Sequence, residues 1–149
     1  LNPAPAKKLP KELIRKTIIL TPNITELETL TGITTRNETQ KIIQASKQLL
    51  KQGPQYIIVT LGKKGALIIS KDEVTHIPTI KVKPIDTTGA GDAFNGALAV
   101  ALAEKQEIIK AVRFANIVAA LKVTMKGAQT GLPTRKQLLE FIKKKEIKI

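Results

Sequence analysis

The sequence contains no cysteine and no tryptophan, a single histidine, and only 3% aromatic residues among its 149. The lack of cysteine excludes a disulfide scaffold, a thiol nucleophile and a cysteine-based zinc site. With His76 alone, neither a histidine metal cluster nor a Ser/His/Asp triad is expected. No uninterrupted apolar run approaches the ~18 residues that a membrane-spanning helix needs. Because 42% of the residues are hydrophobic, we expect a folded cytoplasmic protein with a packed core and no membrane partner.

Acidic residues are also few, 12 against 25 Lys and Arg, which gives a net charge of +13. Such an excess suggests an anionic partner, for example phosphate, a nucleotide or a nucleic acid. All but four of the cations are lysines spread along the chain, and few aromatic residues are present to stack on bases. Compositional drift toward Lys and Ile therefore accounts for the charge better than a nucleic-acid surface, although a basic nucleic-acid binder stays an alternative.

The chain begins with Leu1 rather than Met, and no basic and apolar targeting segment follows it. Its length fits one domain or part of a larger one. We therefore expect a fragment, so that any functional group preceding Leu1 in a longer protein is not visible in the sequence.

Short β-branched runs predict the strands. Tyr56–Val59 is typical of a strand that is covered on both faces of a sheet, and Ile18–Leu20 is a similar run that ends at a proline turn. Ala66–Ser70 and Val74–Pro78 flank the polar turn 71–73, which predicts a hairpin.

Helices are predicted between and after these strands. In the first half, one helix is expected to be capped near Asn23 or Thr25 and to stop at Gly32. A second is expected to begin at a capping-box pattern formed by Asn37 and Gln40 and to end at Gly53. Alternation of strands and helices indicates an open α/β sheet, with ligands at the carboxyl ends of its strands.

Three further helices are expected in the second half, over residues 90–102, about 107–124 and about 134–145. The first carries an unbroken apolar stripe at helical spacing, and the second is apolar almost all round in its latter half. The third is expected to turn Leu138, Leu139 and Ile142 inward.

Asp86–Asp92 holds two glycines and leads directly into the first of these three helices. Glycines allow a ligand to approach the backbone closely, and the free amides of a helix start point at the same place, so the segment can hold an anion. Asp92 in the first turn can then accept a proton from a hydroxyl that attacks phosphorus. The alternative is a tight strand-to-helix turn with a favourable first-turn acid.

The segment Asp-Thr-Thr-Gly-Ala-Gly-Asp-Ala-Phe-Asn-Gly, residues 86–96, resembles the C-terminal signature of the ribokinase-like (pfkB-type) sugar kinases. Four more segments match that family in the same order: 1–6, 21–26, 60–65 and 126–129. The resemblance implies a three-layer α/β/α, Rossmann-like fold with an open, mostly parallel sheet and a C-terminal β-hairpin segment. Residues 1–149 would form the C-terminal, nucleotide-binding part of a single kinase domain, without its N-terminal half and lid.

The resemblance also implies roles for individual residues. Asp92 would be the base that contacts and activates the sugar hydroxyl, with Gly89, Ala90 and Gly91 forming the anion hole. The nucleotide-binding positions would be Asn23, Glu26, Thr60, Leu61, Gly62, Lys63, Lys64, Gly65, Gly91, Asp92 and Asn116, with Glu26 acting on Mg²⁺ through water. A monovalent cation, K⁺, would be held by Asp86, Thr88, Lys122, Met125, Gly127 and Gly131. Gly131 departs from the serine expected there, so this position offers only backbone.

Several of these residues also have a structural explanation. Asn23 can be a helix cap, Glu26 a first-turn acid, and residues 60–65 an ordinary turn. Asn116 lies in an apolar helix, and because a buried amide needs partners we expect it to face a ligand. His76 is expected to have a structural or surface role.

The expected activity is transfer of the γ-phosphoryl group of ATP to the 5-hydroxyl of ribose, with ATP, Mg²⁺ and K⁺ as cofactors and no nucleic-acid partner. The resemblance implies a homodimer formed through the lid. The alternatives are another sugar or nucleoside kinase of the same family, such as a fructokinase, and an inactive nucleotide-binding fragment.

Overall fold

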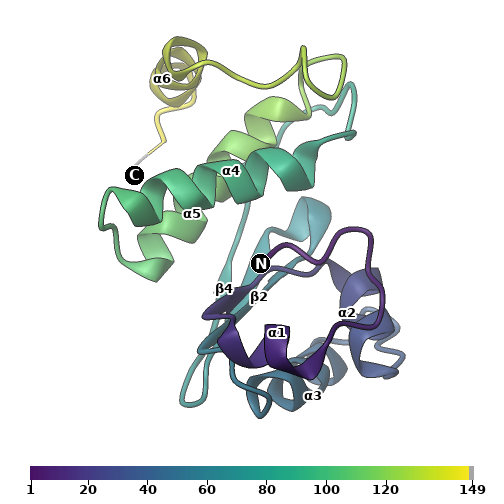
Figure 1. Ribbon diagram of the computed structural model, residues 1–149. Coiled ribbons are helices and arrows are strands. Elements are labelled where there is room, and N and C mark those ends of the chain that lie inside the picture. Colours follow the sequence, from purple (N-terminus) through teal and green to yellow (C-terminus); the bar gives the residue numbers. More distant parts are fainter. Residues whose placement is uncertain (148–149) are drawn as a thin grey trace. The chain divides into compact units, whose positions relative to one another are not determined.

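The computed structural model describes residues 1–147, which form two compact units, Leu1–His76 and a second unit that begins at Ile77 (Figure 1). Each unit is described by itself. That both belong to a single kinase domain remains a prediction.

The first unit contains a four-stranded sheet in the order β1-β2-β3-β4. β1 (Ile19–Leu20) runs parallel to β2 (Tyr56–Thr60), and β2 is antiparallel to β3 (Ala66–Ile69). β4 (Val74–Ile77) completes the predicted hairpin, whose turn is closed by a 2.9 Å hydrogen bond from the Ser70 amide to the Glu73 carbonyl. The sheet is therefore mixed, and all four predicted strands are present.

α2 (Ile24–Thr31) and α3 (Thr39–Leu50) supply the helical side of the first unit's core. Alternate side chains of β2 and β3 belong to this core, as the period of a strand requires, and the side chains between them are buried as well. The buried members of this core are Leu20, Leu27, Ile42, Ala45, Leu49, Ile57, Val59, Leu67 and Ile69. The predicted strand runs therefore supply this core together with the predicted helices.

The ends of α2 agree with the predicted ones. Asn23 is its N-cap, and Gly32 ends it in the left-handed conformation at φ 71°. A shorter helix, α1 (Lys11–Lys16), was not predicted from the sequence. It buries only Ile14 and so leaves no periodic apolar pattern.

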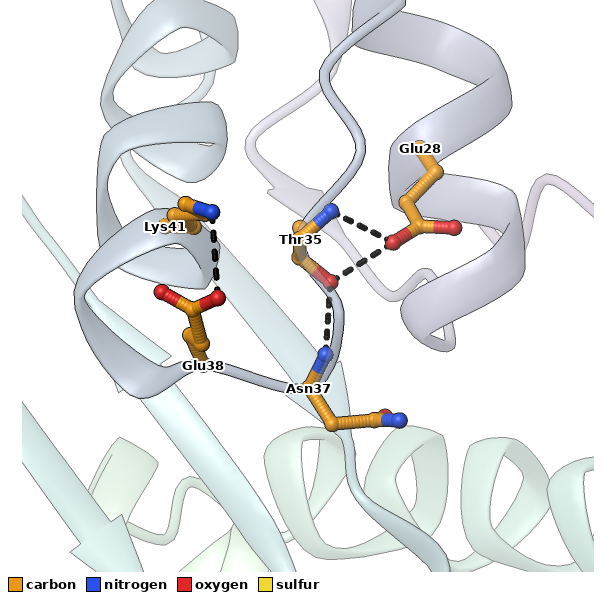
Figure 2. A network of polar contacts seen from close by, with 5 residues as sticks. All are labelled: Glu28, Thr35, Asn37, Glu38 and Lys41. Atoms are coloured by element: carbon orange, nitrogen blue, oxygen red, sulfur yellow. Dashed lines mark hydrogen bonds and ion pairs between the residues drawn. The ribbon is translucent and has the colours of Figure 1, made fainter.

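The predicted capping box at Asn37 is wrong. Asn37 has φ 59°, a left-handed conformation, and the N-cap of α3 is Glu38, which makes no capping bond through its side chain. The loop is instead fixed by Thr35, which is fully buried (Figure 2). A Glu28 carboxylate oxygen accepts hydrogen bonds from the Thr35 amide at 2.6 Å and from its hydroxyl at 2.7 Å, and these bonds lower the pKa of Glu28.

The second unit is helical. α4 (Ala90–Ala103) and α5 (Ile108–Lys122) pack side by side, and α6 (Arg135–Lys144) contacts α5 (Figure 1). The predicted apolar stripe of α4 is buried at Ala93, Phe94, Ala97, Leu98 and Ala101.

α6 begins at a capping box in which the Thr134 and Gln137 side chains each accept from the other's backbone amide. Leu138 is buried as predicted. The prediction that Leu139 faces inward is wrong, because this side chain is 58% exposed. The apolar face of α6 is thus narrower than its sequence suggests.

Within residues 1–147 no helix is both long and apolar enough to cross a membrane.

Gly32 and Gly96 provide a matched pair of tests of this fold. Replacing Gly32 with Ala is expected to lower the free energy of unfolding by about 1 kcal/mol, because an L side chain is strained at its positive φ. Gly96 lies inside α4, where an added Cβ meets no atom within 4 Å, so Gly96→Ala is expected to stabilise the protein by about 0.5–1 kcal/mol. Urea denaturation measures both, and equal effects would contradict the assigned backbone.

Candidate active site

The turn in front of α4 is shaped by Gly89 and left open at Gly91. Gly89 has φ 77°, and a Cβ there would lie 3.1 Å from the carbonyl oxygen of Ala128, so a glycine is required. A Cβ added at Gly91 would meet nothing within 4 Å. Packing therefore does not explain this glycine, and the space beside it is open to a ligand.

Unpaired amides mark the start of α4. The Ala93 amide makes the first helical bond, to the Gly89 carbonyl at 2.9 Å, and the Ala90 amide donates to the Thr87 carbonyl at 3.2 Å. Among the described residues, the amides of Gly89, Gly91 and Asp92 find no acceptor. Free donors at a helix start are the requirement for the predicted anion hole. Of its three expected residues, Gly89 and Gly91 have amides that are free within the described part of the chain, whereas the amide of Ala90 is already bonded and that of Asp92 is free in its place.

Asp92 lies in the first turn of α4 with an exposed side chain. No group within residues 1–147 makes a hydrogen bond or an ion pair with its carboxylate. The carboxylate is thus free to take a proton from an approaching hydroxyl, beside amides that are free to hold an anion.

Asp86 holds the turn in place. One oxygen of its carboxylate accepts from the Thr88 amide at 2.9 Å and the other from the Gly127 amide at 2.8 Å. The amide and hydroxyl of Thr88, then the amide of Gly127 and the charge of Lys122, lower the pKa of Asp86 to about 2. Asp86 therefore carries its charge throughout the neutral range and joins two segments that lie far apart in the sequence.

Lys122, the last residue of α5, is fully buried. Its ammonium lies 3.4 Å from the Asp86 carbonyl oxygen and 3.5 Å from that of Met125. The second unit thus brings the six predicted cation positions together: Asp86, Thr88, Lys122, Met125, Gly127 and Gly131. The group does not fit a free K⁺ ion, because an ion bound by these carbonyls would lie beside the Lys122 ammonium, and like charges repel.

Asn116 is buried in α5, and its side-chain amide donates to the carbonyl of Ile77 at 2.9 Å. The protein itself therefore supplies a partner for this buried amide. Burial no longer supports a ligand-facing role, and the nucleotide-binding role of Asn116 stays a prediction that rests on the resemblance alone.

In the first unit, Asn23 and Glu26 bind each other in a reciprocal capping box. The Asn23 side chain accepts from the Glu26 amide, and the Glu26 carboxylate accepts from the Asn23 amide, both at 2.8 Å. Asn23 also pairs with Thr60 in a parallel bridge, so both residues lie at the carboxyl ends of β1 and β2. The structural explanations of Asn23 as a helix cap and of Glu26 as a first-turn acid are correct, and their nucleotide role stays a prediction.

The loop from Thr60 to Gly65 follows β2 and contains the 3₁₀ turn η1 (Gly62–Lys64). It is closed by a 2.7 Å bond from the Leu61 amide to the Gly65 carbonyl, and both its glycines have positive φ. Its Lys63 and Lys64 side chains are exposed. The loop is thus adjacent to Asn23 through Thr60, as a nucleotide-binding edge of the sheet requires.

His76 makes a contact that the sequence does not reveal. Its ring Nε2 lies 2.7 Å from the Lys64 carbonyl oxygen and so connects β4 to the loop after β2. The expected structural role of His76 is consistent with this contact. No alternation or motif predicts it, because the two residues meet only through the hairpin.

A comparison with family models gives a match to the pfkB family of carbohydrate kinases over residues 1–135. The fold is ribokinase-like, with a four-stranded mixed sheet and helices. The chain belongs to the pfkB family of carbohydrate kinases.

Individual relatives agree with this assignment. A ribokinase of Haemophilus influenzae is 43% identical over 95% of this chain, and a deoxyribokinase of Salmonella typhi is 39% identical over 95%. The solved structure of Arabidopsis thaliana ribokinase, complexed with ribose and ATP, superposes with a TM-score of 0.85 at 38% identity, covering 92% of this chain and 44% of that one. The chain spans about half the length of the curated relatives it matches, 46% for each of the two relatives above.

The Asp86 contacts predict a pH dependence. Because the pKa of Asp86 in the folded protein lies below its ordinary value of 3.8, its bonds stabilise the fold above that pH, and the contribution is lost as the pH falls from 3.8 to about 2. Urea midpoints across this range are expected to fall more steeply for the native protein than for Asp86→Asn. Asp72→Asn, in the exposed β3–β4 turn, is the matched control. Parallel curves for the native protein and Asp86→Asn would show that the Asp86 carboxylate does not stabilise the fold through its bonds to the Thr88 and Gly127 amides.

Proposed function

We propose that the chain is the nucleotide-binding part of an enzyme that transfers the γ-phosphoryl group of ATP to the 5-hydroxyl of ribose. The proposal combines membership of a sugar-kinase family with the open, unpaired start of α4. The single observation that carries it is the placement of an unengaged carboxylate, Asp92, in the same helical turn as amides without acceptors.

In this proposal the amides of Gly89, Gly91 and Asp92 face the phosphoryl group as negative charge develops on its oxygens. Preorganised donors of this kind contribute about 2.7–4 kcal/mol each in comparable oxyanion holes. Asp92 accepts the proton of the sugar hydroxyl as its oxygen attacks phosphorus, and such general-base assistance contributes about 10²–10⁴ in rate. Phosphoryl transfer needs mainly positioning and charge stabilisation, and these residues provide both.

Nucleotide binding is assigned to the edge of the first unit's sheet. Thr60–Gly65 would hold the nucleotide, and Asn23 would act on its phosphates. A nucleotide-binding role of Asn116 rests on the resemblance alone. Glu26 fits an indirect role toward Mg²⁺, because its carboxylate is partly exposed and residues 1–147 hold no cluster of three or more acidic or histidine side chains. Mg²⁺ keeps several waters and binds mainly through substrate phosphates, where it neutralises their charge.

Ribose is proposed as the acceptor because a relative named ribokinase is 43% identical over most of the chain. Deoxyribose is the second candidate, since a deoxyribokinase covers the same share of the chain at 39% identity. Fructose and nucleosides remain further alternatives within the family. The homodimer that the resemblance implies belongs to the proposal for the complete protein.

Replacing Asp92 with Asn is expected to lower kcat by about 10²–10⁴ in the complete protein in which the chain occurs, because the amide cannot accept the hydroxyl proton. Nucleotide binding, measured by calorimetric titration with ATP, is expected to stay close to that of the native protein. Glu104→Gln, at the opposite end of the same helix, is the control and should keep full activity. An unchanged rate in Asp92→Asn would remove this residue from the mechanism.

The acceptor is tested with a panel of ribose, deoxyribose, fructose and a nucleoside, each assayed for ATP-dependent phosphorylation by the complete protein. The highest kcat/KM is expected with ribose. A higher value with another sugar would support the proposed kinase activity but assign it a different acceptor. Absence of phosphorylation of any of them, with heat of ATP binding retained, would favour a non-catalytic nucleotide-binding protein.

A further inference from the structure

The buried ammonium of Lys122 is not used by the proposed chemistry. Lys122 is the largest fully buried residue in the described part of the chain, although lysine is rarely buried without a partner. Removing an ammonium from water costs several kcal/mol unless nearby groups compensate its charge. A group placed there at such cost calls for a physical explanation.

Three segments meet at this ammonium. It lies at the end of α5, and its two acceptors are the carbonyls of Asp86, in front of α4, and Met125, in the turn after α5. The negative charge of the Asp86 carboxylate also attracts this ammonium, although no ion pair joins the two among the described residues, and the same carboxylate binds the Thr88 and Gly127 amides. The contacts of Lys122 at 3.4 and 3.5 Å are long for hydrogen bonds, so its attraction to these carbonyls is mainly that of a charge for dipoles.

The same place is the one where the resemblance to the sugar kinases implies a monovalent cation. Two of the other predicted carbonyls already accept a hydrogen bond each within the turn. The Gly127 carbonyl accepts from the Gly131 amide at 3.1 Å, and the Lys122 carbonyl accepts from the Met125 amide at 3.0 Å. Gly131 brings no hydroxyl, and a Cβ at this position would overlap the Gly127 carbonyl, so a serine does not fit this turn either.

We propose that the ammonium of Lys122 is a built-in cation that takes the place of a free monovalent ion and holds the turn before α4 in position. The inference rests on the proposed kinase function. Lys122 does not touch the substrate. It is a positioning residue, which acts through the Asp86 carbonyl and carboxylate on the turn that leads to Gly89 and Gly91. The kinase should therefore work equally well with or without added K⁺.

The first test compares the complete native protein in KCl and in choline chloride, at ~0.1 M so that ionic strength is constant. Equal kcat and equal Tm in the two salts are expected. A loss of activity or a lower Tm in choline would overturn the proposal, because it would show that a free cation is still bound. The Tm comparison tests whether a free cation is bound even if the protein phosphorylates no sugar. A failure of the kinase proposal can therefore be distinguished from a failure of this one.

The second test removes the charge. Lys122→Ala leaves space for an ion, and we expect kcat in choline to fall by about 10²-fold, as when catalytic groups are misplaced by about 1 Å. KCl is expected to restore most of the activity and to raise the Tm of this variant, because an ion that binds only the folded state stabilises it. Lys126→Ala, an exposed lysine four residues away, is the control and should not respond.

Lys122→Met keeps most of the length of the side chain without its charge. It should lose activity as Lys122→Ala does, but without rescue by KCl, because the side chain still fills the space. If Lys122→Ala does not fold, the proposal is tested by Lys122→Met and by the comparison of the native protein in the two salts. Full activity of Lys122→Met in choline, or a folded Lys122→Ala whose lost activity does not respond to KCl, would contradict the proposal.

Discussion

The carboxylate of Asp86 fixes the segment on which the proposed chemistry depends. It accepts one hydrogen bond from the amide of Thr88, two residues away, and another from the amide of Gly127, forty-one residues along the chain. With Asp86 turned to these donors, the following amides at Gly89, Gly91 and Asp92 keep no acceptor within the described part of the protein. An anion can then be bound without rearrangement of the backbone, which is the condition under which fixed donors contribute most to rate.

Charge is organised in two layers around this turn. The inner layer holds the buried Lys122 and the carboxylate of Asp86, whose opposite charges attract each other. The outer layer holds the exposed Asp92 and the unpaired amides, which are left for ligands.

The sequence predicted most of the elements, because each carries its own periodic signal. The strand at Tyr56, the stripe of α4 and the cap at Asn23 follow from local spacing, and the structure confirms them. Asn37 shows the limit of such spacing, since the capping-box pattern is present but tertiary bonds to Thr35 decide the loop. Leu139 was misassigned because burial depends on neighbouring elements, which the sequence does not place.

The candidate site was predicted to a similar degree. Glycines at 89 and 91 and the acid at 92 are visible as a motif, and their geometry agrees with an open helix start. The buried position of Lys122 was not foreseen, although a lysine that directly follows the apolar run 117–121 is the signal that could have indicated it. The His76 contact with the Lys64 carbonyl had no such signal, because it arises only from the folded hairpin.

The central claim is that the free amides before and within the first turn of α4 bind the phosphoryl group as it is transferred. Its most direct test is an amide NMR spectrum of the complete protein with ADP, Mg²⁺, ribose and aluminium fluoride, which imitates the phosphoryl group in transit. The account predicts large shifts of the Gly89, Gly91 and Asp92 amides and none at Gly96, in the same helix. Unchanged resonances at the first three positions, with the nucleotide bound, would contradict it.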